Sequence, residues 1–431
     1  MSNLNLIPIG KLFDLEKGSL QSSKCTEGEY TFITAAEEWK TNNEYSHECE
    51  ALIFAAAASG SLGRTHYIND KFITSDLCFI LTPKDSKKYP INLKFYHFVF
   101  NSLKDEIVKN TKSGTSKESI NQSNLRNYKI PYFAIDKQNL WIDKLVNTKS
   151  IKEDLEFELS SGQSLLKQLK QTILQEAIEG KLTEKWRAKN PDIGTAKELL
   201  AQIKIEKEKL IKEKKLKASK PLAPINEDEI PFDIPKNWEW CRLGDVITNI
   251  KGGGTPSKAN SKFWNGNIPW ASVKDLKNDF IDFTDDFITE EALNNSSTNL
   301  IPKGNIIIST RMGLGKIAFN NIDTCINQDL KAIFLNNINS KYFFSVYKTY
   351  SIVGRGMTVD GIRQEDLLSY MFPLPPLEEQ KEIVTTIEKL FAICDELESE
   401  IKQNKITVQT IMATVLKEAF ETKENNHEYK A

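Results

Sequence analysis

The chain has 431 residues, of which 40% are hydrophobic, and it carries a formal net charge of −2. This length predicts about two to three domains, and the apolar content excludes a disordered chain. The charge excludes a uniformly basic surface, so any nucleic-acid contact must come from local basic clusters.

The cysteines and histidines give no sign of a metal or disulfide site. The six cysteines form no CxxC pair and the four histidines form no HExxH pattern, so we expect free thiols in a reducing cytosol and no bound metal. The N-terminus, MSNLNLIPIGKLFDLEKG, lacks the basic and apolar regions of a signal peptide. No apolar run approaches the ~20 residues that cross a bilayer. We therefore expect a cytoplasmic protein.

Residues 1–150 are predicted to form a first mixed α/β domain, followed by a helical region at 151–220. Short runs such as EALIFA at 50–55 alternate with Gly, Asn and Pro, as buried strands alternate with turns. Helical spacing then predicts a helix from about Ile151 to Arg187. Residues 195–220 contain nine lysines and four glutamates. This stretch is either a solvated helix face or one that follows a phosphate backbone. The apolar seam of the first helix includes Leu166, Leu169 and Ile173.

The second half repeats this order. A proline-rich acidic linker is predicted at 221–235, a second mixed domain at 236–375, a second long helix at 376–421 and a polar tail at 422–431. Pro376, Glu378 and Glu379 suit the first turn of the helix, because acids complement the helix dipole there. Its heptad seam comprises Ile383, Ile387, Leu390, Leu397 and Ile401, together with Cys394.

Five short matches in the same order relate the two halves. PIGKLFDLEKG at 8–18 matches RLGDVITNIKG at 242–252, and SINQSNLRNYKIPYF at 119–133 matches GIRQEDLLSYMFPLP at 361–375. The offsets drift only between 234 and 253 residues. We therefore predict an α+β protein with a pseudo-twofold internal repeat. Two similar mixed domains would be separated by two long antiparallel helices that form a coiled coil.

The sequence offers no catalytic motif. GLGKIA at 313–318 and GGGTPSK at 252–258 lack Walker spacing, and no GxSxG or adenine-methyltransferase motif occurs. Asp192 with Glu213 and Lys215 could make a nuclease triplet, but such triplets arise by chance in a Lys/Glu-rich helix. A binding protein without an active site of its own is the favoured interpretation.

Double-stranded DNA fits two similar modules, since each could contact one half-site. Glycine-rich turns that carry Lys, Arg and Thr suit phosphate and base contacts. Trp264 and Trp270 are expected in the core and not as stacking platforms. The candidate DNA-contacting residues are Lys17, Lys24, Arg64, His66, Lys112, Thr115 and Lys117 in the first copy, and Lys251, Thr255, Lys258, Arg311, Lys316, Arg355, Thr358 and Arg363 in the second.

Four stretches together carry a family resemblance. They are IPKNWEWCRLGDVITNIKGGGTPSK, GNIPWASVKDL, LPPLEEQKEIV and ILQEAIEGKLTEKWR, and in this order they resemble the specificity (S) subunit of type I restriction–modification systems over essentially the whole chain. The resemblance implies a subunit without catalytic activity in which each target-recognition domain reads one half of a bipartite DNA site. It also implies that the helices set the gap between the halves.

The resemblance further implies partners and cofactors. Two methyltransferase (M) subunits would methylate adenine with S-adenosylmethionine, and restriction (R) subunits would use ATP with Mg to translocate and cleave unmodified phage DNA. The first domain departs from the family pattern, since it reads IPYFAIDKQNLW at 130–141 and KGSLQSSK at 17–24. Two alternatives stay open: a coiled-coil scaffold without DNA binding, and a nuclease or methyltransferase enzyme.

Overall fold

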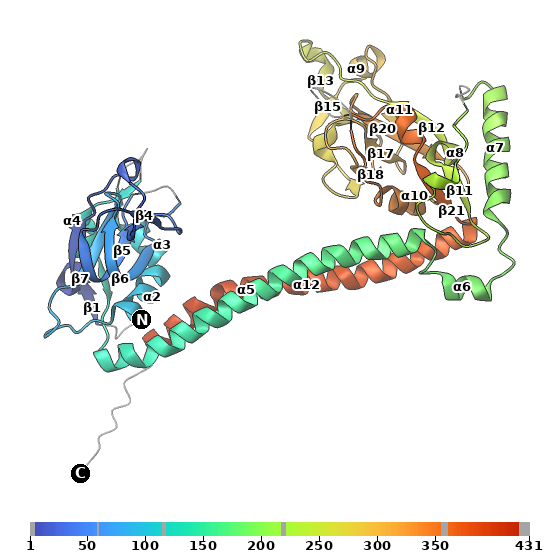
Figure 1. The fold of residues 1–431 in the computed structure, drawn as a ribbon. Coiled ribbons are helices and arrows are strands. Elements are labelled where there is room, and N and C mark those ends of the chain that lie inside the picture. Colours follow the sequence, from blue (N-terminus) through green and yellow to red (C-terminus); the bar gives the residue numbers. More distant parts are fainter. Residues whose placement is uncertain (1–4, 58–59, 114–117, 217–220, 355–360, 422–431) are drawn as a thin grey trace. The chain divides into compact units, whose positions relative to one another are not determined.

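The computed structural model describes residues 5–57, 60–113, 118–216, 221–354 and 361–421. The chain divides into two compact units, one of Met1–Gly162 with Glu400–Ala431 and the other of Gln163–Ser399. Two long helices contribute to both units, namely α5 (Ile135–Ile178) and α12 (Leu377–Glu421) (Figure 1). Among the described residues, no helix is both long and apolar enough to cross a membrane.

The first unit is built on a six-stranded sheet in the order β2-β7-β5-β6-β3-β4. Helix α2 packs on β5 and β6, and the aromatic side chains of Phe13, Tyr96 and Phe100 meet edge to face in the core beneath it. The elements before α5 are β1 (Leu6–Pro8), α1 (Ile9–Leu12), β2 (Phe13–Lys17), the 3-10 turn η1 (Ser22–Lys24), β3 (Tyr30–Ile33), β4 (Lys40–Asn42), β5 (His47–Ala55), β6 (Thr65–Thr74), β7 (Cys78–Pro83), α2 (Leu93–Ser102), α3 (Lys104–Thr111), β8 (Lys112–Ser113), β9 (Ser119–Ile120), α4 (Gln122–Asn127) and β10 (Lys129–Pro131).

The second unit contains a five-stranded sheet, β12-β20-β17-β18-β14, and a four-stranded sheet, β15-β13-β19-β16. Its elements before α12 are α6 (Glu184–Lys189), α7 (Ala196–Lys212), η2 (Glu227–Glu229), β11 (Glu239–Arg242), α8 (Leu243–Val246), β12 (Ile247–Gly252), η3 (Ser261–Phe263), β13 (Trp264–Ala271), η4 (Val273–Asp275), β14 (Phe280–Ile281), β15 (Asp286–Ile288), α9 (Glu290–Asn294), β16 (Leu300–Ile301), β17 (Ile306–Ser309), β18 (Ile317–Asn320), β19 (Thr324–Ile326), β20 (Leu330–Leu335), α10 (Ser340–Tyr347), α11 (Gln364–Leu368) and β21 (Met371–Leu374).

The six-stranded sheet of the first unit and the five-stranded sheet of the second confirm the predicted internal repeat. In each unit the strand order is the same for the first five strands, because β12, β20, β17, β18 and β14 take the places of β2, β7, β5, β6 and β3. The pairing register agrees as well: Leu6 faces Pro131 in β1–β10, and Trp240 faces Pro373 in β11–β21. These are the partners that the sequence offsets of 234 and 242 predict. The four-stranded sheet is an addition of the second copy.

The first long helix differs from its prediction at both ends. Helix α5 begins at Ile135 and not near Ile151, because Trp141 and Leu145 are buried in the core of the first domain. It ends at Ile178, since Gly180 adopts a positive φ of 74° that terminates the helix. The lysine-rich stretch is therefore a separate helix, α7, which packs on α8.

The helix seam is buried or half-buried at most predicted positions. In the second unit Leu166, Ile173, Ile383 and Ile387 are buried and Leu390 is half-buried, and in the first unit Ile401 is half-buried beside Gly162. Leu169 and Leu397 correct the prediction: they are 46% and 43% exposed, so they lie at the edge of the seam.

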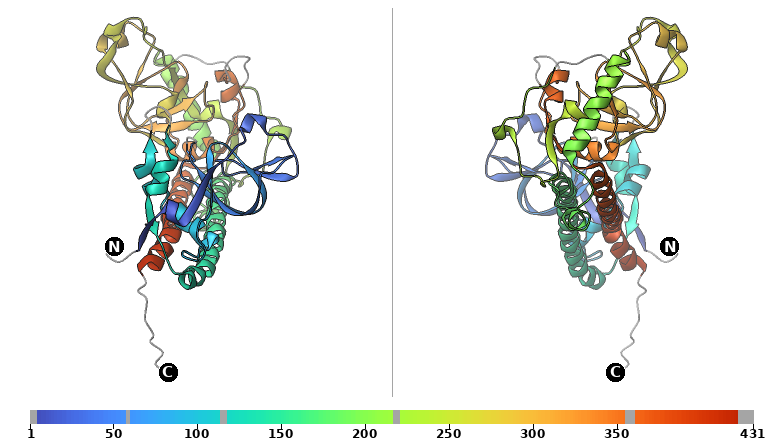
Figure 2. Two further views of the ribbon diagram at one scale, coloured as in Figure 1. Left: turned by 90° about the vertical axis from the view of Figure 1, so that its left-hand side faces the viewer. Right: turned by 90° about the vertical axis from the view of Figure 1, so that its right-hand side faces the viewer.

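Figure 2 shows α5 and α12 side by side from two directions. Lys170 of α5 bridges Asp395 and Glu398 of α12 at 2.8 Å each.

Residues 221–235 are more than a linker. Arg242 is only 6% exposed, and its guanidinium bonds to both Glu229 carboxylate oxygens, at 2.9 and 2.8 Å. It also donates to the carbonyl oxygens of Ala223, Pro224 and Ser369. One buried arginine therefore holds this segment against the second domain.

Candidate nucleic-acid interface

The glycine-rich loop after β12 is held against the segment that enters β20. A Cβ at Gly253 would lie 2.0 Å from the carbonyl oxygen of Ile326, so this approach requires glycine. Gly254 donates its backbone N–H to the same oxygen at 3.0 Å and accepts from the Trp270 indole at 3.1 Å. Trp270 is buried, as predicted, while Trp264 is half-buried and donates to the Ser257 carbonyl. Both tryptophans thus fix the loop.

The loop between β17 and β18 is held against the same segment. Thr310 donates its N–H to the Asp329 carbonyl at 2.9 Å, and the Arg311 guanidinium lies 3.8 Å from the Asp329 carboxylate. A third segment joins them, because Ile362 donates to the Thr310 carbonyl at 2.9 Å and Gly361 forms a β-bridge with Arg311. Two predicted loops of the second domain therefore contact residues 326–329, and a third contacts one of those two loops at Thr310 and Arg311.

The first domain has the same arrangement around residues 74–78. Gly18 takes the place of Gly253, since a Cβ there would lie 2.1 Å from the Ser75 carbonyl oxygen. The N–H of Ala56, at the end of β5, donates to the Leu77 carbonyl at 2.9 Å, and Ile120 donates to the Ala56 carbonyl at 2.7 Å. The first copy lacks the glycine cluster in its sequence. The one glycine of the corresponding stretch, Gly18, nevertheless makes the same close approach to a backbone carbonyl that Gly253 makes in the second domain.

The predicted contact residues of the second domain include several accessible cations. Lys251, Lys258 and Lys316 are exposed. The Lys251 ammonium lies 5.4 Å from the centroid of the Phe334 ring. Arg363 is exposed, and its ion pair with Asp366 at 3.0 Å raises its pKa. Thr255 donates its hydroxyl to Gln328. Arg355 and Thr358 lie outside the described residues.

The first domain presents fewer accessible cations. Lys17 and Lys24 are exposed. Arg64 is turned inward, where it donates to the Ala35 carbonyl and lies 3.8 Å from Glu37. Lys112 forms an ion pair with Glu118 at 2.6 Å. Thr115 and Lys117 lie outside the described residues. The prediction that Arg64 is available to DNA is therefore not supported in this conformation.

His66 is held by its neighbours as well. The Trp39 indole donates to its Nδ1 at 3.4 Å, and burial lowers its pKa. Its Nε2 is buried without a hydrogen-bond partner among the described residues. A neutral imidazole in this position is a packing residue with one free polar atom and not a cationic phosphate contact.

Sequence reasoning missed the segments on which the loops converge. Asn327 caps the turn, since its side chain accepts from the Asp329 N–H at 3.1 Å and donates to the Asp329 carboxylate at 3.0 Å. Ser75 acts similarly in the first domain by accepting from Leu77 N–H at 3.3 Å. Both segments overlap another of the five repeat matches, SDLCFIL at 75–81 with QDLKAIF at 328–334, so the repeat itself was the signal that could have identified them.

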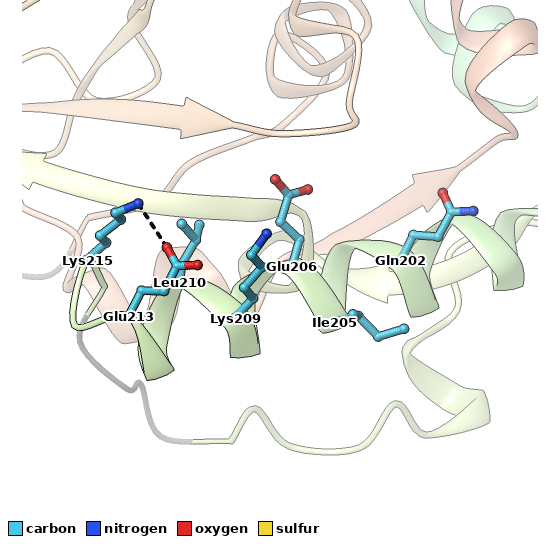
Figure 3. A pocket seen from close by; sticks show the side chains of 7 residues that line it. All are labelled: Gln202, Ile205, Glu206, Lys209, Leu210, Glu213 and Lys215. Carbon is cyan, nitrogen blue, oxygen red and sulfur yellow. Dashed lines mark ion pairs between the residues drawn. The ribbon is translucent and has the colours of Figure 1, made fainter.

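Helix α7 carries a surface groove of about 470 Å³, lined only by its own side chains and those of the turn that follows (Figure 3). In it, Glu213 pairs with Lys215 at 2.9 Å. On the domain side, Lys207 donates to the carbonyls of Gly244 and Asp245, and Glu206 accepts from Asn337. The groove is lined by both acidic and basic side chains of one helix and the turn after it, so we interpret it as a solvated helix face. No group of three His, Cys, Asp or Glu that could hold a metal occurs in the part of the chain that the structure describes.

Comparison with known proteins identifies the repeat. The family model of the type I restriction modification DNA specificity domain matches residues 1–160 and 235–407. The specificity subunits of the type I restriction enzymes EcoEI and EcoAI of Escherichia coli are 30% and 31% identical, over 271 and 268 residues. Each alignment covers 58% of this chain and 44% of the relative, so the chain matches under half the length of either relative. The EcoDI specificity subunit of the same species is 23% identical, with 96% of this chain and 87% of the relative aligned.

Solved structures share the fold. A chain from a study of complex assembly and conformational transition of the type I R-M system superposes with a TM-score of 0.70 at 15% identity, covering 97% of this chain and 98% of that one. The HsdS subunit from Thermoanaerobacter tengcongensis superposes with a TM-score of 0.54, also at 15% identity, and covers 97% of each chain.

Proposed function

Because the chain belongs to the family of type I restriction modification DNA specificity domains, we propose that it is the DNA-recognition and scaffold subunit of such a complex. The observation that carries the proposal is a repeated cluster of three loops: in each domain two loops contact one segment, residues 74–78 or 326–329, and the third loop contacts the second. Two equivalent loop clusters on one chain suit two unlike half-sites, because the framework is shared while the loop side chains differ.

Each recognition domain then reads one half of a bipartite site. In the second domain, Lys251, Lys258 and Lys316 supply phosphate contacts that position the domain, and Arg311 is suited to a guanine edge. In the first domain Lys17 and Lys24 are the exposed cations of the cluster. Fewer cations there mean that backbone amides and neutral side chains carry more of the recognition.

The partners follow from the same proposal. The helices α5 and α12 are the docking elements for two M subunits, which supply S-adenosylmethionine-dependent adenine methylation, and R subunits add ATP- and Mg-dependent translocation and cleavage. The chain itself contributes recognition and assembly and no active site, and it acts in the cytoplasm. Since α5 and α12 contribute to both compact units, we expect their length to determine the spacing of the half-sites.

The direct test is the adenine methylome of cells that express the M subunits with and without this chain. A split motif that requires the chain supports the proposal, and its two halves give the sequences read. Methylation without a bipartite preference, or a motif that persists when the chain is absent, would overturn it.

A salt titration separates DNA recognition from the coiled-coil alternative. Affinity of the complex for a duplex carrying the motif should fall steeply with salt, because phosphate contacts release counterions. Replacing Lys251 and Lys258 by alanine should reduce the slope of log K against log salt by about one per lysine that contacts phosphate. The matched control replaces Lys204 and Lys212, exposed lysines on α7, and should leave the slope unchanged. A scaffold without DNA contact would show no slope in any variant.

A further inference from the structure

The β17–β18 loop carries an exposed methionine in left-handed backbone. Met312 has a φ of 51°, and its side chain is 56% exposed. Side chains with a Cβ rarely adopt this conformation, because the Cβ approaches the following carbonyl oxygen. Three other described non-glycine residues share it: Asn265 and Asn337 are of the type that tolerates it, and Lys214 follows a helix end. Met312 is the apolar residue of the four.

Hydrogen bonds beneath the loop hold Met312 in this conformation. Ser309 is fully buried, and its hydroxyl lies within hydrogen-bond distance of the carbonyl oxygens of Arg311 at 2.7 Å and Met312 at 2.8 Å. Its N–H donates to the Lys316 carbonyl at 3.0 Å, which closes the base of the loop. Thr310 is tied to Asp329 by its N–H at 2.9 Å. The backbone on both sides of Met312 is therefore held by hydrogen bonds.

The neighbours of Met312 in the loop are cationic residues and glycines. Arg311 precedes it with a half-exposed guanidinium, and Lys316 follows it four residues later and is exposed. Gly313 and Gly315 lie between them, and a Cβ at Gly315 would meet nothing within 4 Å. A protruding apolar side chain flanked by two cations suits a polyanion with an apolar interior, and stacked base pairs between two phosphate backbones have that character.

We propose that Met312 is an apolar wedge that enters between adjacent base pairs of the half-site read by the second domain, while Lys316 holds a flanking phosphate and Arg311 contacts a base edge beside the wedge. This inference rests on the proposed function and adds a specificity-determining residue to it. A wedge reads sequence through the ease of unstacking, because pyrimidine–purine steps open more readily than others. In the first domain the equivalent loop has no such residue among its described positions, since Leu62 is only 9% exposed.

The presence of methionine at position 312 favours a contact over an ordinary turn. Glycine at 312 would remove both the backbone strain and the exposed apolar surface, so methionine is the less favourable residue for the free protein. This gives a test in which the informative variant is not expected to misfold. Met312→Gly and Met312→Asn both suit the backbone and remove the wedge, whereas Met312→Leu keeps an apolar side chain.

The experiment uses the full chain assembled with its M subunits. After the methylome has given the wild-type motif, duplexes carrying that motif are prepared with 2-aminopurine in place of each adenine, on either strand of both half-sites, that is not itself methylated. Fluorescence should rise at one base step of one half-site with the wild type and with Met312→Leu. The rise should be lost with Met312→Gly and Met312→Asn, and their methylation of that motif should slow by about tenfold or more, as expected when an unstacking contact is removed.

Two outcomes would overturn the wedge alone. One is a Met312→Gly complex that methylates the motif within twofold of the wild-type rate, and the other is an unchanged 2-aminopurine signal at every step. Thermal melting of the variants checks that any loss is not a folding defect. If the wild-type methylome has no bipartite motif, the proposed function itself fails, which is a different result from either of these.

Discussion

Gln138 and Gln380 make the same hydrogen bonds in the two recognition domains. Each is fully buried in the first turn of its long helix and donates its side-chain amide to the carbonyl five residues earlier, that of Phe133 at 2.7 Å or Pro375 at 2.9 Å. Each also accepts from the backbone N–H of an asparagine that caps the domain's own helix, Asn92 at 2.6 Å or Asn339 at 2.9 Å. A buried glutamine thus ties each domain to the helix that leaves it.

Replacing either glutamine by alanine should destabilise the domain to which it belongs. The change leaves a half-buried backbone N–H and a buried carbonyl without these partners, and the buried carbonyl alone costs roughly 1–3 kcal/mol. Hydrogen exchange followed by mass spectrometry should show faster exchange in α10 for Gln380→Ala and in α2 for Gln138→Ala. Gln171→Ala is the matched control, because Gln171 is exposed on α5. Equal exchange in Gln380→Ala and the control would contradict this role.

This pair also shows what the sequence could and could not predict. The repeat aligned Tyr128 with Tyr370 and Pro131 with Pro373, and the two prolines do lie in equivalent strands, β10 and β21. The helix after the first edge was placed too late, since IDKQNLW has no helical apolar stripe and its polar Gln138 gives no hydrophobic signal. Only packing of Trp141 against the first domain shows that the helix has already begun.

The contact residues were harder to predict for a related reason. Arg64 has the residue type and loop position of a DNA contact, but its partners Ala35 and Glu37 lie more than twenty positions earlier in the chain. Arg242 likewise holds Glu229 of a segment whose composition indicates a linker. Long-range pairing decides whether a cation is free, and pairing of this kind is not encoded in local composition.

Arg187 and Glu379 should prove the most sensitive ion pair of the second unit. Glu379 is fully buried and accepts from Arg187 Nε at 2.8 Å, from the Thr183 hydroxyl at 2.8 Å and from the Trp238 indole at 2.9 Å. Arg187→Ala leaves a buried carboxylate without its charged partner and should cost about 3–5 kcal/mol in urea unfolding.

The neighbouring acid supplies the control for this pair. Glu378 is exposed and pairs with Lys381 at 2.6 Å, so Glu378→Gln should cost less than about 1 kcal/mol. A similar loss of unfolding free energy in Arg187→Ala and Glu378→Gln would show that the buried network does not hold the helix start.

His97 should make the first unit sensitive to mild acid. Burial, with smaller contributions from the charges of Lys149 and His66, lowers its pKa to about 4, below the ordinary 6.5. The unfolded chain therefore binds a proton between these two values and the folded chain does not, so stability falls as pH decreases from 6.5 towards 4. Between pH 7 and pH 5 the loss should be about 2 kcal/mol.

The variant that checks this is His97→Gln, compared with the wild type by urea unfolding at pH 7 and pH 5. The variant should lose less stability on acidification, because glutamine does not titrate in this range. An equal pH dependence in both proteins would assign the acid sensitivity to other groups.

Two adjacent glycines test whether close backbone approach positions the glycine-rich loop of the second domain. A methyl group at Gly253 would lie 2.0 Å from the Ile326 carbonyl oxygen, which belongs to the segment at the centre of the loop cluster. At Gly252 it would meet the Lys331 ammonium at 2.8 Å, the far end of a flexible side chain that can move away. Gly253→Ala should therefore displace the loop, whereas Gly252→Ala should be tolerated.

The measurements are methylation of the motif and thermal melting of the chain. Gly253→Ala should reduce methylation through the half-site of the second domain and lower the melting temperature, since backbone atoms cannot yield without breaking the Gly254–Ile326 hydrogen bond. Gly18→Ala should do the same for the other half-site, because its Cβ would lie 2.1 Å from the Ser75 carbonyl oxygen. If Gly253→Ala and Gly252→Ala behaved alike, close approach at Gly253 would not be what positions the loop.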